Sequence, residues 1–442
     1  MILSTGNDAT WLRDSHQRPM KDTSGHMMEA CLARDSVRRV LLSLIAVEQE
    51  RLIKAGVVAQ EKALTAQSIG ATDAQIDRLS IDETSLGFDS LSRLDLVLRV
   101  NQFFQLHTTG VEDYLLVKRR VCDWVELIMQ HFLLLQTPTQ IAFLTSGSTG
   151  APKTIIHEMR ALQAEVTTLL AGPVPMLQPS ARVLSLVPPH HIYGFLFSCI
   201  LPTMAGCDTI DLHQQTPTRG FTVAQAGDLV IATPYIWERL IKSGLQFQPG
   251  VRGISAGAPT TTTTWSVLEM AGLSSLTEVY GATETGGIGF RQASDDAFHL
   301  LAHLERADAH IRHADTVDKI LDIQDKINWT GPRRFTISGR RDDVVQVAGV
   351  NVAPQHVAEQ IGKVFGVNSV DIRVSAGRLH ALIIPSKPDD PTNALEQRIR
   401  AHLLQHLAPP ARPATLTFRA TRPCNDMGKL QDWTGDQPQW CD

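Results

Sequence analysis

The stretch TSGSTGAPK, Thr145 to Lys153, directly follows the apolar run Ile141–Leu144 and combines hydroxyl side chains, glycines and a terminal lysine. Glycines let successive backbone N–H groups converge on one anion, hydroxyls add further donors, and Lys153 adds a positive charge. The stretch therefore predicts a phosphate-binding loop after a β-strand, with an ordinary Ser/Thr/Gly turn as the alternative. The GxxxxGK[ST] spacing of the Walker loop is absent, so a P-loop NTPase is not predicted.

Four other segments follow the same order as the motifs of a known family. They are VPPHHIYGF (Val187–Phe195), YGATETGG (Tyr280–Gly287), GRRDDVVQVAGVNVAPQHVAEQI from Gly339, and PCNDMGKLQ (Pro423–Gln431). Together with TSGSTGAPK they resemble the adenylate-forming superfamily of acyl-CoA synthetases, nonribosomal-peptide adenylation domains and beetle luciferases. The resemblance covers residues 139–435. It implies, in this order, a phosphate loop, an acyl-side segment, an adenine and metal segment, a hinge, and a segment with a catalytic lysine.

Composition limits the class of protein and its partners. The chain has 442 residues, 43% hydrophobic and 20% charged, which predicts a globular protein of two to four domains. A net charge of −5 without a dense basic tract argues against nucleic acid or an anionic membrane as a partner. Six scattered cysteines without ligand spacing indicate neither zinc nor a disulfide framework and fit a reducing cytoplasm. No apolar run is long enough to insert into a membrane.

The periodicity of the sequence changes once, near residues 136–139. We predict a flexible tail over residues 1–35, a helical domain over 36–136, an α/β AMP-binding core over 139–338, and a mobile α+β C-terminal domain over 339–442. Within the helical domain a helix is expected just after Gly87, with Asp89 or Ser90 as its cap. Its apolar face is expected to contain four residues: Leu91, Leu94, Leu98 and Phe104.

The stretch LGFDSLSRLDLVLRVNQFF, Leu86 to Phe104, resembles acyl carrier proteins. In that family the serine of a DSL motif carries phosphopantetheine, and the resemblance assigns this role to Ser90. Two alternatives remain: Ser90 is an N-cap or surface residue, or the segment is a carrier-shaped docking domain without modification. The connection Ile53–Asp77 is longer than carriers usually need.

The α/β core begins unusually early for the adenylate-forming superfamily. Apolar runs at Val183–Val187, Asp228–Thr233, Gly250–Ser255 and Leu276–Tyr280 alternate with helical patterns and predict a sheet covered by helices. One layer of the large domain that usually precedes the phosphate loop is missing. We therefore expect the N-terminal helices, or the second subunit of a homodimer, to complete the acyl pocket.

The resemblance assigns the nucleotide site residue by residue. Glu284 is the expected Mg²⁺ ligand, because hard oxygen donors suit magnesium, and Thr283 contacts the α-phosphate. Asp322 contacts the ribose, with Asp325 as a rival, and Arg340 either faces the ribose or forms a solvated turn. The β- and γ-phosphates are held by Thr145, Ser146, Gly147, Ser148, Thr149, Gly150 and Lys153. The adenine lies against Gly257, Ala258, Pro259, Tyr280 and Gly281.

Catalysis and substrate choice depend on the remaining motif residues. Lys429 is the expected catalytic residue, a mobile ammonium that bridges the substrate carboxylate and the α-phosphate. The resemblance assigns Asp342 to the hinge about which the C-terminal domain swings. His191, Ile192 and Gly194 line the acyl pocket, although His191 could equally be a packed core residue. Ile192 stands where amino-acid-activating domains carry an aspartate, so free α-amino acids are not expected as substrates.

These assignments predict an enzyme that uses ATP and Mg²⁺ to convert a carboxylic acid into an acyl-adenylate, releases pyrophosphate and transfers the acyl group to a thiol. The pattern resembles compact ligases of aryl-polyene and xanthomonadin-type pigment pathways, which implies a hydroxybenzoate as the acid and the phosphopantetheine of an acyl carrier protein as the acceptor. The alternatives are an acyl-CoA synthetase for another small carboxylate and a noncatalytic scaffold.

Overall fold

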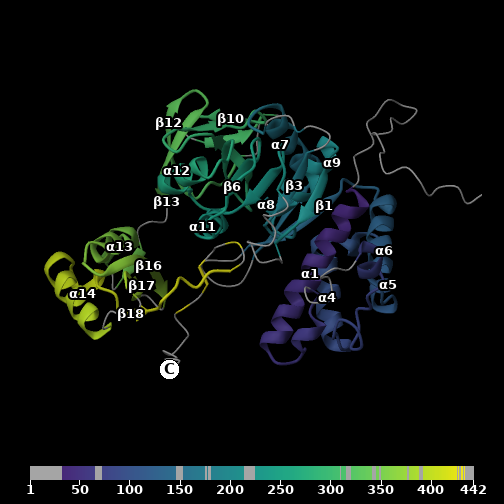
Figure 1. The fold of residues 1–442 in the computed structure, drawn as a ribbon, viewed down its shortest axis with the longest axis horizontal. Helices are drawn as coiled ribbons and strands as arrows, with labels where there is room; N and C mark the ends of the chain where they lie inside the picture. Colours follow the sequence, from purple (N-terminus) through teal and green to yellow (C-terminus); the bar gives the residue numbers. More distant parts are fainter. Residues whose placement is uncertain are drawn as a thin grey trace, which may run out of the picture. The chain divides into compact units, whose positions relative to one another are not determined.

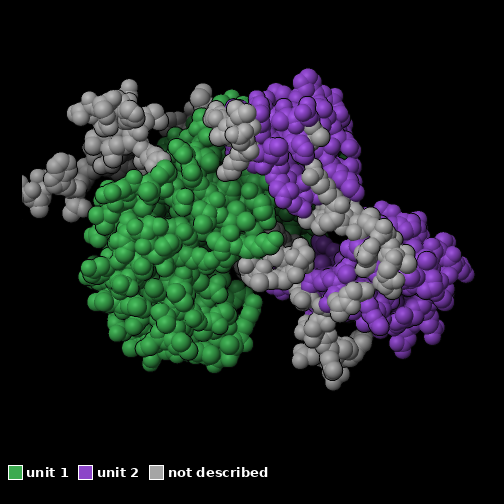
Figure 2. Space-filling view, turned by 180° about the vertical axis from the view of Figure 1, so that it is seen from behind, with its two compact units in different colours: residues 1–294, 301–303 green, residues 295–300, 304–442 purple. Residues whose placement is uncertain are grey.

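The computed structural model describes most of the chain, in two compact units (Figures 1 and 2). The first unit comprises the described residues up to 294 together with 301–303, and the second comprises 295–300 and those from 304 onward. The described residues are 32–64, 72–145, 153–174, 177, 181–213, 224–308, 310–314, 320–340, 345–347, 350–375, 378–387, 392–425, 427, 430–431 and 433. The expected flexible tail therefore lies almost entirely outside the described residues.

The first unit begins with helices. In α1 (Arg34–Lys54) and α6 (Val121–Leu134), buried apolar residues recur at helical spacing, as in Val121, Trp124, Val125 and Ile128 of α6. These two helices pack against each other, α1 also packs against α4 (Ser90–Phe104), and α5 (Glu112–Val117) contacts α4 and α6. The short segments η1 (Gln60–Lys62), α3 (Asp73–Asp77) and η2 (Leu106–Thr108) lie between them in sequence.

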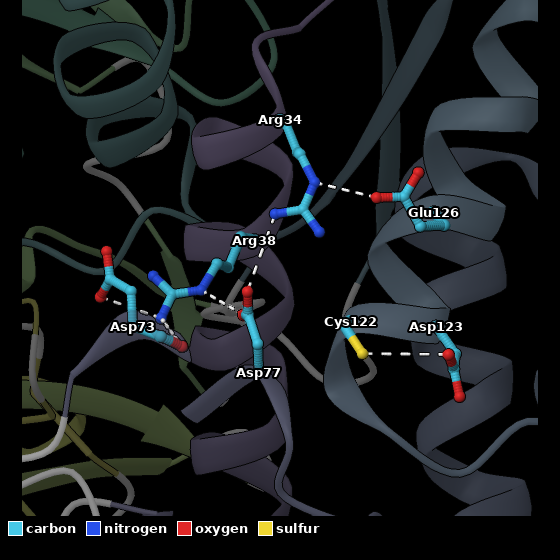
Figure 3. A network of polar contacts seen from close by, with 7 residues as sticks. All are labelled: Arg34, Arg38, Asp73, Asp77, Cys122, Asp123 and Glu126. Carbon is cyan, nitrogen blue, oxygen red and sulfur yellow. Dashed lines mark hydrogen bonds and ion pairs between the residues drawn. The ribbon is translucent and has the colours of Figure 1, made fainter. Parts of the chain in front are cut away.

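A network of ion pairs connects α1 to α3 and α6 (Figure 3). Arg34 contacts Glu126 of α6 at 2.9 Å, and Arg38 contacts Asp77 of α3 at 2.6 Å and Asp73 at 3.0 Å. Arg34, Glu126 and Asp73 are largely exposed, so each of their pairs is worth no more than about 1 kcal/mol. Burial of the apolar side chains, at about 1.5–3 kcal/mol for each large one, therefore contributes more to this packing.

The expected cap of α4 is confirmed, but its expected apolar face is wrong. Asp89 is the N-cap and accepts a hydrogen bond from the backbone N–H of Ser92 at 2.7 Å. Of the four residues predicted to share a buried face, only Phe104 is buried, whereas Leu91, Leu94 and Leu98 are exposed. The face that contacts α1 and β1 instead carries Leu96, Val97, Val100 and Phe103. Both faces of α4 are apolar, so helical spacing alone could not choose between them.

The α/β core predicted from the sequence is confirmed. Its strands in the first unit follow the order β8-β7-β6-β5-β3-β4, with parallel pairing from β7 through β4 and an antiparallel β7–β8 pair. The predicted runs contain β5 and most of β3, β6 and β7, and β5 is buried along its whole length, as expected of a strand covered on both faces. The bounds are β3 (Arg182–Ser185), β4 (Asp208–Asp211), β5 (Leu229–Ala232), β6 (Arg252–Ala256), β7 (Ser275–Ala282) and β8 (Gly286–Arg291).

Helices and one separate hairpin complete the first unit. The hairpin consists of β1 (Gln140–Leu144) and β2 (Thr154–Glu158) in antiparallel register. Helix α11 begins at a Thr233 cap followed by Pro234 in the first turn, a sequence that favours helix initiation, and its Trp237 is fully buried. The other helical segments are α7 (Met159–Ala171), α8 (Ile192–Phe195), the π-helical turn η3 (Leu196–Ile200), α9 (Leu201–Ala205), α11 (Pro234–Lys242) and α12 (Thr262–Met270).

The second unit contains the C-terminal α+β fold. Strands β16 and β17 pair antiparallel, β17 and β18 pair parallel, and α13 packs against both β16 and α14. Residues Val357, Ile361, Leu395 and Ile399 form the centre of this core. The bounds are β9 (Phe298–Leu300), β10 (Leu304–Ala307), β11 (His310–His313), β12 (Asp325–Gly331), β13 (Arg334–Arg340), β14 (Val345–Val347), β15 (Val350–Val352), α13 (Pro354–Gly362), β16 (Val367–Ser375), β17 (Arg378–Pro385), α14 (Thr392–His406), η4 (Pro409–Ala411) and β18 (Thr415–Phe418).

The two units divide the chain differently from the expected domains. The helices expected as a domain over residues 36–136 belong to the same unit as the α/β core, and the second unit takes in β9–β13 as well as the segment predicted from residue 339. The helices group with the core because α1 packs on η3 and α4 packs on β1. Within the described residues no helix is long and apolar enough to cross a membrane.

Candidate functional site

The predicted phosphate loop connects the two strands of the β1–β2 hairpin. At its base the backbone N–H of Thr145 donates to the carbonyl of Lys153 at 2.9 Å, and the N–H of Lys153 donates to Oγ1 of Thr145 at 3.3 Å. Both ends of the loop are thus fixed to one hairpin, and Lys153 is exposed there. The predicted phosphate-binding residues Ser146–Gly150 lie outside the described residues.

The predicted metal segment forms a tight turn between β7 and β8. A Cβ on Gly281 would come within 2.3 Å of the carbonyl oxygen of Gly286, and Gly286 itself has a φ of +70°, so glycine is required at both positions. The hydroxyl of Thr285 accepts from the N–H of Ala282 at 3.2 Å and donates to the carbonyl of Gly286 at 2.9 Å. The turn therefore presents the side chain of Glu284 to solvent.

Two residues that the sequence analysis did not identify contact this turn from outside. Nε2 of His157, on β2, lies 2.7 Å from the carbonyl oxygen of Thr283. Glu165, on α7, is buried with its carboxyl against the backbone of Gly286 and Gly287, and burial raises its pKa to about 7, although a hydrogen bond from the Gly287 backbone acts in the opposite direction. The adjacent glycines at the end of YGATETGG were the available signal of a close approach.

The predicted adenine-side residues Gly257, Ala258 and Pro259 directly follow β6 and are exposed. Gly257 has a φ of +93°, which favours glycine. Strands β6 and β7 run parallel, so their carboxyl ends, which carry Gly257 and Tyr280, lie at the same edge of the sheet. This edge is where α/β sheets usually bind ligands.

A buried carboxylate fixes the segment after Pro259. Thr260 donates its backbone N–H to Oε1 of Glu278, on β7, at 3.0 Å. Glu278 also forms an ion pair with Arg291 at 2.7 Å. The adenine-side segment is thus attached to the same strand that leads into the Thr283–Gly287 turn.

The predicted acyl-side residues form the start of α8. A Cβ on Gly194 would lie 2.0 Å from the carbonyl oxygen of Pro188, so only glycine fits there. The hydroxyl of Tyr193 donates to the carbonyls of Ala232 and Ile254, at 3.1 and 3.0 Å, which attaches this segment to β5 and β6. Ile192 is largely buried at the N-terminus of α8, next to His191.

A chain of polar side chains joins this segment to α1. Oγ of Ser43 lies 2.8 Å from Nδ1 of His190 and 3.3 Å from Nε2 of His213, and Nδ1 of His213 contacts Asp211. Burial, with the nearby His191, His213 and Arg99, holds the pKa of His190 well below its usual value. Burial would raise the pKa of Asp211, but the contact with His213 brings it below its usual value.

Helix α1 makes further polar contacts with the helical run after His191. Arg39 donates to the carbonyl of Ser198 at 2.7 Å, and Ser36 donates to the carbonyl of Cys199 at 3.2 Å. Both acceptors lie in the π-helical turn η3. Helix α1 thus contacts the acyl-side segment through Ser43 and the turn that follows this segment through Arg39 and Ser36.

The remaining predicted residues are placed in part. Asp322 is exposed in the second unit and accepts a hydrogen bond from Gln324 at 2.9 Å, and its rival Asp325 begins β12. The backbone of Arg340 ends β13, but its side chain, together with all of Asp342 and Lys429, lies outside what the structure describes. Ser90 is exposed as the first residue of α4.

The donor set fits magnesium held with a nucleotide. Among the described residues no group of three or more histidine, cysteine or acidic side chains is arranged to hold a metal ion by itself. Mg²⁺ in nucleotide sites is usually held by one or two carboxylates together with phosphate oxygens. The exposed carboxylate of Glu284, close in sequence to Thr283, meets this requirement.

The chain is similar to known proteins both in sequence and in fold. The model of the family described as AMP-binding enzyme matches residues 90–311 and so includes α4. The chain is 42% identical to a 4-coumarate–CoA ligase of Rhodobacter capsulatus, across 90% of this chain and 100% of that protein. It is 39% identical to a 4-coumarate–CoA ligase of Cereibacter sphaeroides, across 91% of this chain and 97% of that protein. The fold is similar to that of ATP-bound MatB from Rhodopseudomonas palustris, with a TM-score of 0.54 and 15% identity. The similarity covers 88% of this chain and 91% of that chain.

Proposed function

Because the chain belongs to the AMP-binding enzyme family, we propose that it activates a hydroxylated phenylpropenoic acid such as 4-coumarate and transfers it to coenzyme A. The chain is an acid–thiol ligase that uses ATP and Mg²⁺. The observation that supports the substrate most strongly is the 42% identity to a 4-coumarate–CoA ligase over the whole length of that relative. The hydroxybenzoate and the acyl carrier protein expected from the sequence become the alternative substrate and acceptor.

The nucleotide half of the reaction belongs to the exposed edge of the first unit. Lys153 and the loop that it ends would hold the terminal phosphates, and the exposed Glu284 would hold Mg²⁺, which would neutralise charge on the phosphate oxygens. Thr283 contacts the α-phosphate that the substrate carboxylate attacks. Lys429 neutralises the charge that develops between carboxylate and phosphate, and pyrophosphate leaves. In the second step the thiol of coenzyme A attacks the acyl carbon and AMP leaves.

The acyl half belongs to the His190–Gly194 segment. Ile192 is apolar and offers no partner for a substrate ammonium group, which supports an uncharged aryl acid over an α-amino acid. The polar chain from Asp211 to His190 keeps His190 neutral and oriented. Helix α1 then takes the place of the missing layer of the large domain and backs the acyl pocket.

The acceptor and the compartment follow from the same proposal. Coenzyme A is the acceptor named for the curated relatives, so a separate carrier protein and a modified Ser90 are not needed. Four of the six cysteines are described, and all four are free thiols. A reducing cytoplasm, which supplies ATP and coenzyme A, is the compartment that we propose.

Product analysis tests this function. The enzyme is incubated with ATP, Mg²⁺, coenzyme A and, in turn, 4-coumarate, 4-hydroxybenzoate, a fatty acid and an amino acid, and AMP and acyl-CoA are measured. We expect 4-coumaroyl-CoA with the highest kcat/KM. A parallel assay replaces coenzyme A with a phosphopantetheine-loaded carrier protein. Preference for an amino acid, or for the carrier over coenzyme A, contradicts the proposal.

A further inference from the structure

We infer that His157 and Glu165 are positioning residues that hold the Thr283–Gly287 turn in a fixed place relative to the β1–β2 hairpin and α7. This inference rests on the proposed function, since it assigns their role to the nucleotide half of the ligase reaction. Both residues follow the loop closely in sequence, on β2 and α7, whereas the turn that they contact lies more than a hundred residues further along the chain.

The first contact fixes the start of the turn. His157 lies on β2 opposite Ile141 of β1, four residues after Lys153. Its Nε2 lies 2.7 Å from the carbonyl oxygen of Thr283, and its ring packs edge-on against Phe143 with 6.0 Å between centroids. The same hairpin carries Thr145 and Lys153, so these two residues and the turn cannot shift independently while this contact is kept.

The second contact fixes the end of the turn. The carboxyl of Glu165 lies so close to the chain that a Cβ on Gly286 would be 2.6 Å from Oε2 and a Cβ on Gly287 would be 2.4 Å from Oε1. Such distances do not occur between real atoms, so a side chain at either position would displace the Glu165 carboxyl from its place. The Gly-Gly end of the turn thus leaves room for this carboxyl, and the φ of +70° at Gly286 favours glycine independently.

The chemical form of Glu165 suits a role in positioning and not in substrate binding. The side chain is buried, with 3% of the residue exposed, and no cation among the described residues contributes to the shift of its pKa. A buried carboxyl without a counter-ion favours its neutral form, consistent with the rise of its pKa to about 7. Oε1 has no side-chain or backbone partner in the described part of the chain. The hydrogen bond from the backbone of Gly287 is therefore the interaction by which Glu165 would hold the turn.

Together the two contacts place Thr283 and Glu284 between two fixed points. Glu284 itself is exposed, and under the proposed function it would hold a magnesium ion together with phosphate oxygens of the nucleotide. A displacement of about 1 Å in such a group can cost up to ~10²-fold in rate. Loss of either contact is therefore expected to weaken the use of Mg·ATP, with little effect on the binding of the acid.

Single variants test the inference. Glu165→Ala and His157→Phe, which keeps the ring but removes the donor, are compared with Glu165→Gln, which keeps the shape and the acceptor. Thr167→Ala, an exposed change on the same helix, is the matched control. We expect kcat/KM for Mg·ATP to fall roughly tenfold or more in the first two variants, with the KM for the acid within about twofold of wild type. Glu165→Gln and Thr167→Ala are expected to remain within about threefold.

A suppression experiment guards against a simple folding defect. Gly287→Ala should be strongly impaired because its Cβ meets the Glu165 carboxyl, and adding Glu165→Ala should restore several-fold of the lost activity. Three results would overturn the inference: wild-type kinetics in Glu165→Ala, an equal rise in the KM values for Mg·ATP and for the acid, or no recovery of activity in the double variant. Calorimetry with Mg·ATP alone distinguishes failure of this inference from failure of the proposed function. If the wild-type enzyme binds the nucleotide tightly but activates none of the acids, the proposed function is contradicted and the inference is not.

Discussion

The nucleotide-side turn and the acyl-side segment are held by different means. The Thr283–Gly287 turn is fixed through its backbone, by glycines that admit close contacts and by two side chains that reach main-chain atoms. The His190–Gly194 segment is fixed partly through side chains, by a polar chain that runs from His190 through Ser43 of α1 to His213 and Asp211. Contacts to main-chain atoms suit the binding of ATP, because ATP is the same whichever acid is activated. Side chains can differ from one enzyme to another, so contacts between side chains suit the binding of a particular acid.

This difference predicts that the two halves of the reaction can be damaged separately. Variants on the turn should alter the kinetics for Mg·ATP, and variants in the polar chain should alter those for the acid. Lys429, which we propose contacts both reacting groups, should alter the chemical step itself.

Glu284→Ala is expected to have the largest effect. Removal of the carboxylate that we propose as the metal ligand should lower kcat/KM for Mg·ATP by ~10²-fold or more and raise the Mg²⁺ concentration needed for half-maximal rate. Steady-state assays over a range of Mg²⁺ measure both quantities. Glu269→Ala, an exposed change on α12, is the control. An unchanged Mg²⁺ requirement would remove Glu284 from the metal site.

Lys429→Ala is expected to slow adenylation by ~10²-fold, because one preorganised contact to the transition state is lost. The affinity for Mg·ATP should change far less, since the lysine acts on charge that develops only during the reaction. Rapid-quench measurement of acyl-adenylate separates the two quantities, with the exposed Lys387→Ala as the control. Adenylation at the wild-type rate means that the catalytic lysine lies elsewhere.

Ser43→Ala tests whether the polar chain affects the acyl half of the reaction alone. The change leaves His190 and His213 without their shared partner, a loss of about 1–3 kcal/mol, so kcat/KM for the acid should fall roughly tenfold. The KM for Mg·ATP should stay within about twofold. Glu50→Ala, an exposed change on α1, serves as the control. An equal loss for both substrates would show that α1 supports the whole unit and not the acyl half.

Glu165→Gln is expected to change how stability depends on pH. Burial raises the pKa of Glu165 from 4.5 to about 7, so between these values the folded chain keeps a proton that the unfolded chain has lost. The free energy of unfolding should therefore fall as pH rises through this window, by up to about 3 kcal/mol relative to Glu165→Gln. Urea unfolding of both proteins at pH 4.5 and pH 8 measures the difference. Parallel pH profiles would mean that Glu165 is not buried in neutral form.

Ser90→Ala is expected to have the smallest effect. Ser90 is exposed at the start of α4, where Asp89 already supplies the cap, so activity and stability should remain within about twofold and about 0.5 kcal/mol of wild type. Mass spectrometry after incubation with coenzyme A and a phosphopantetheinyl transferase should find no added group. An added phosphopantetheine that Ser90→Ala abolishes would make α4 part of a carrier after all.

Local requirements of the backbone made one part of the molecule predictable. The apolar runs of β3, β5 and β6 each favour a buried strand, so the sheet could be predicted from short stretches. YGATETGG was identified by its resemblance to a family motif, and its glycines fit the tight turn that the structure shows there. The cap of α4 by Asp89 is of the same kind.

Contacts between distant residues could not be predicted in this way. Ser43 and His190 are 147 positions apart, and His157 and Thr283 are 126 apart, so no local pattern connects them. The buried face of α4 was predicted wrongly for a related reason. Leu91 and Leu98 satisfy the same helical spacing as Val97 and Val100, and only the packing of α4 against α1 and β1 decides between the two faces.

The most direct test of the ligase mechanism is a pulse and chase on the wild-type enzyme. Enzyme in excess is mixed with Mg·ATP and 4-coumarate without coenzyme A, and the quenched products are separated. We predict pyrophosphate and about one equivalent of enzyme-bound acyl-adenylate, which disappears within one turnover when coenzyme A is added and yields AMP and the thioester. Formation of ADP and phosphate, or no acyl-adenylate with any acid, would contradict the account.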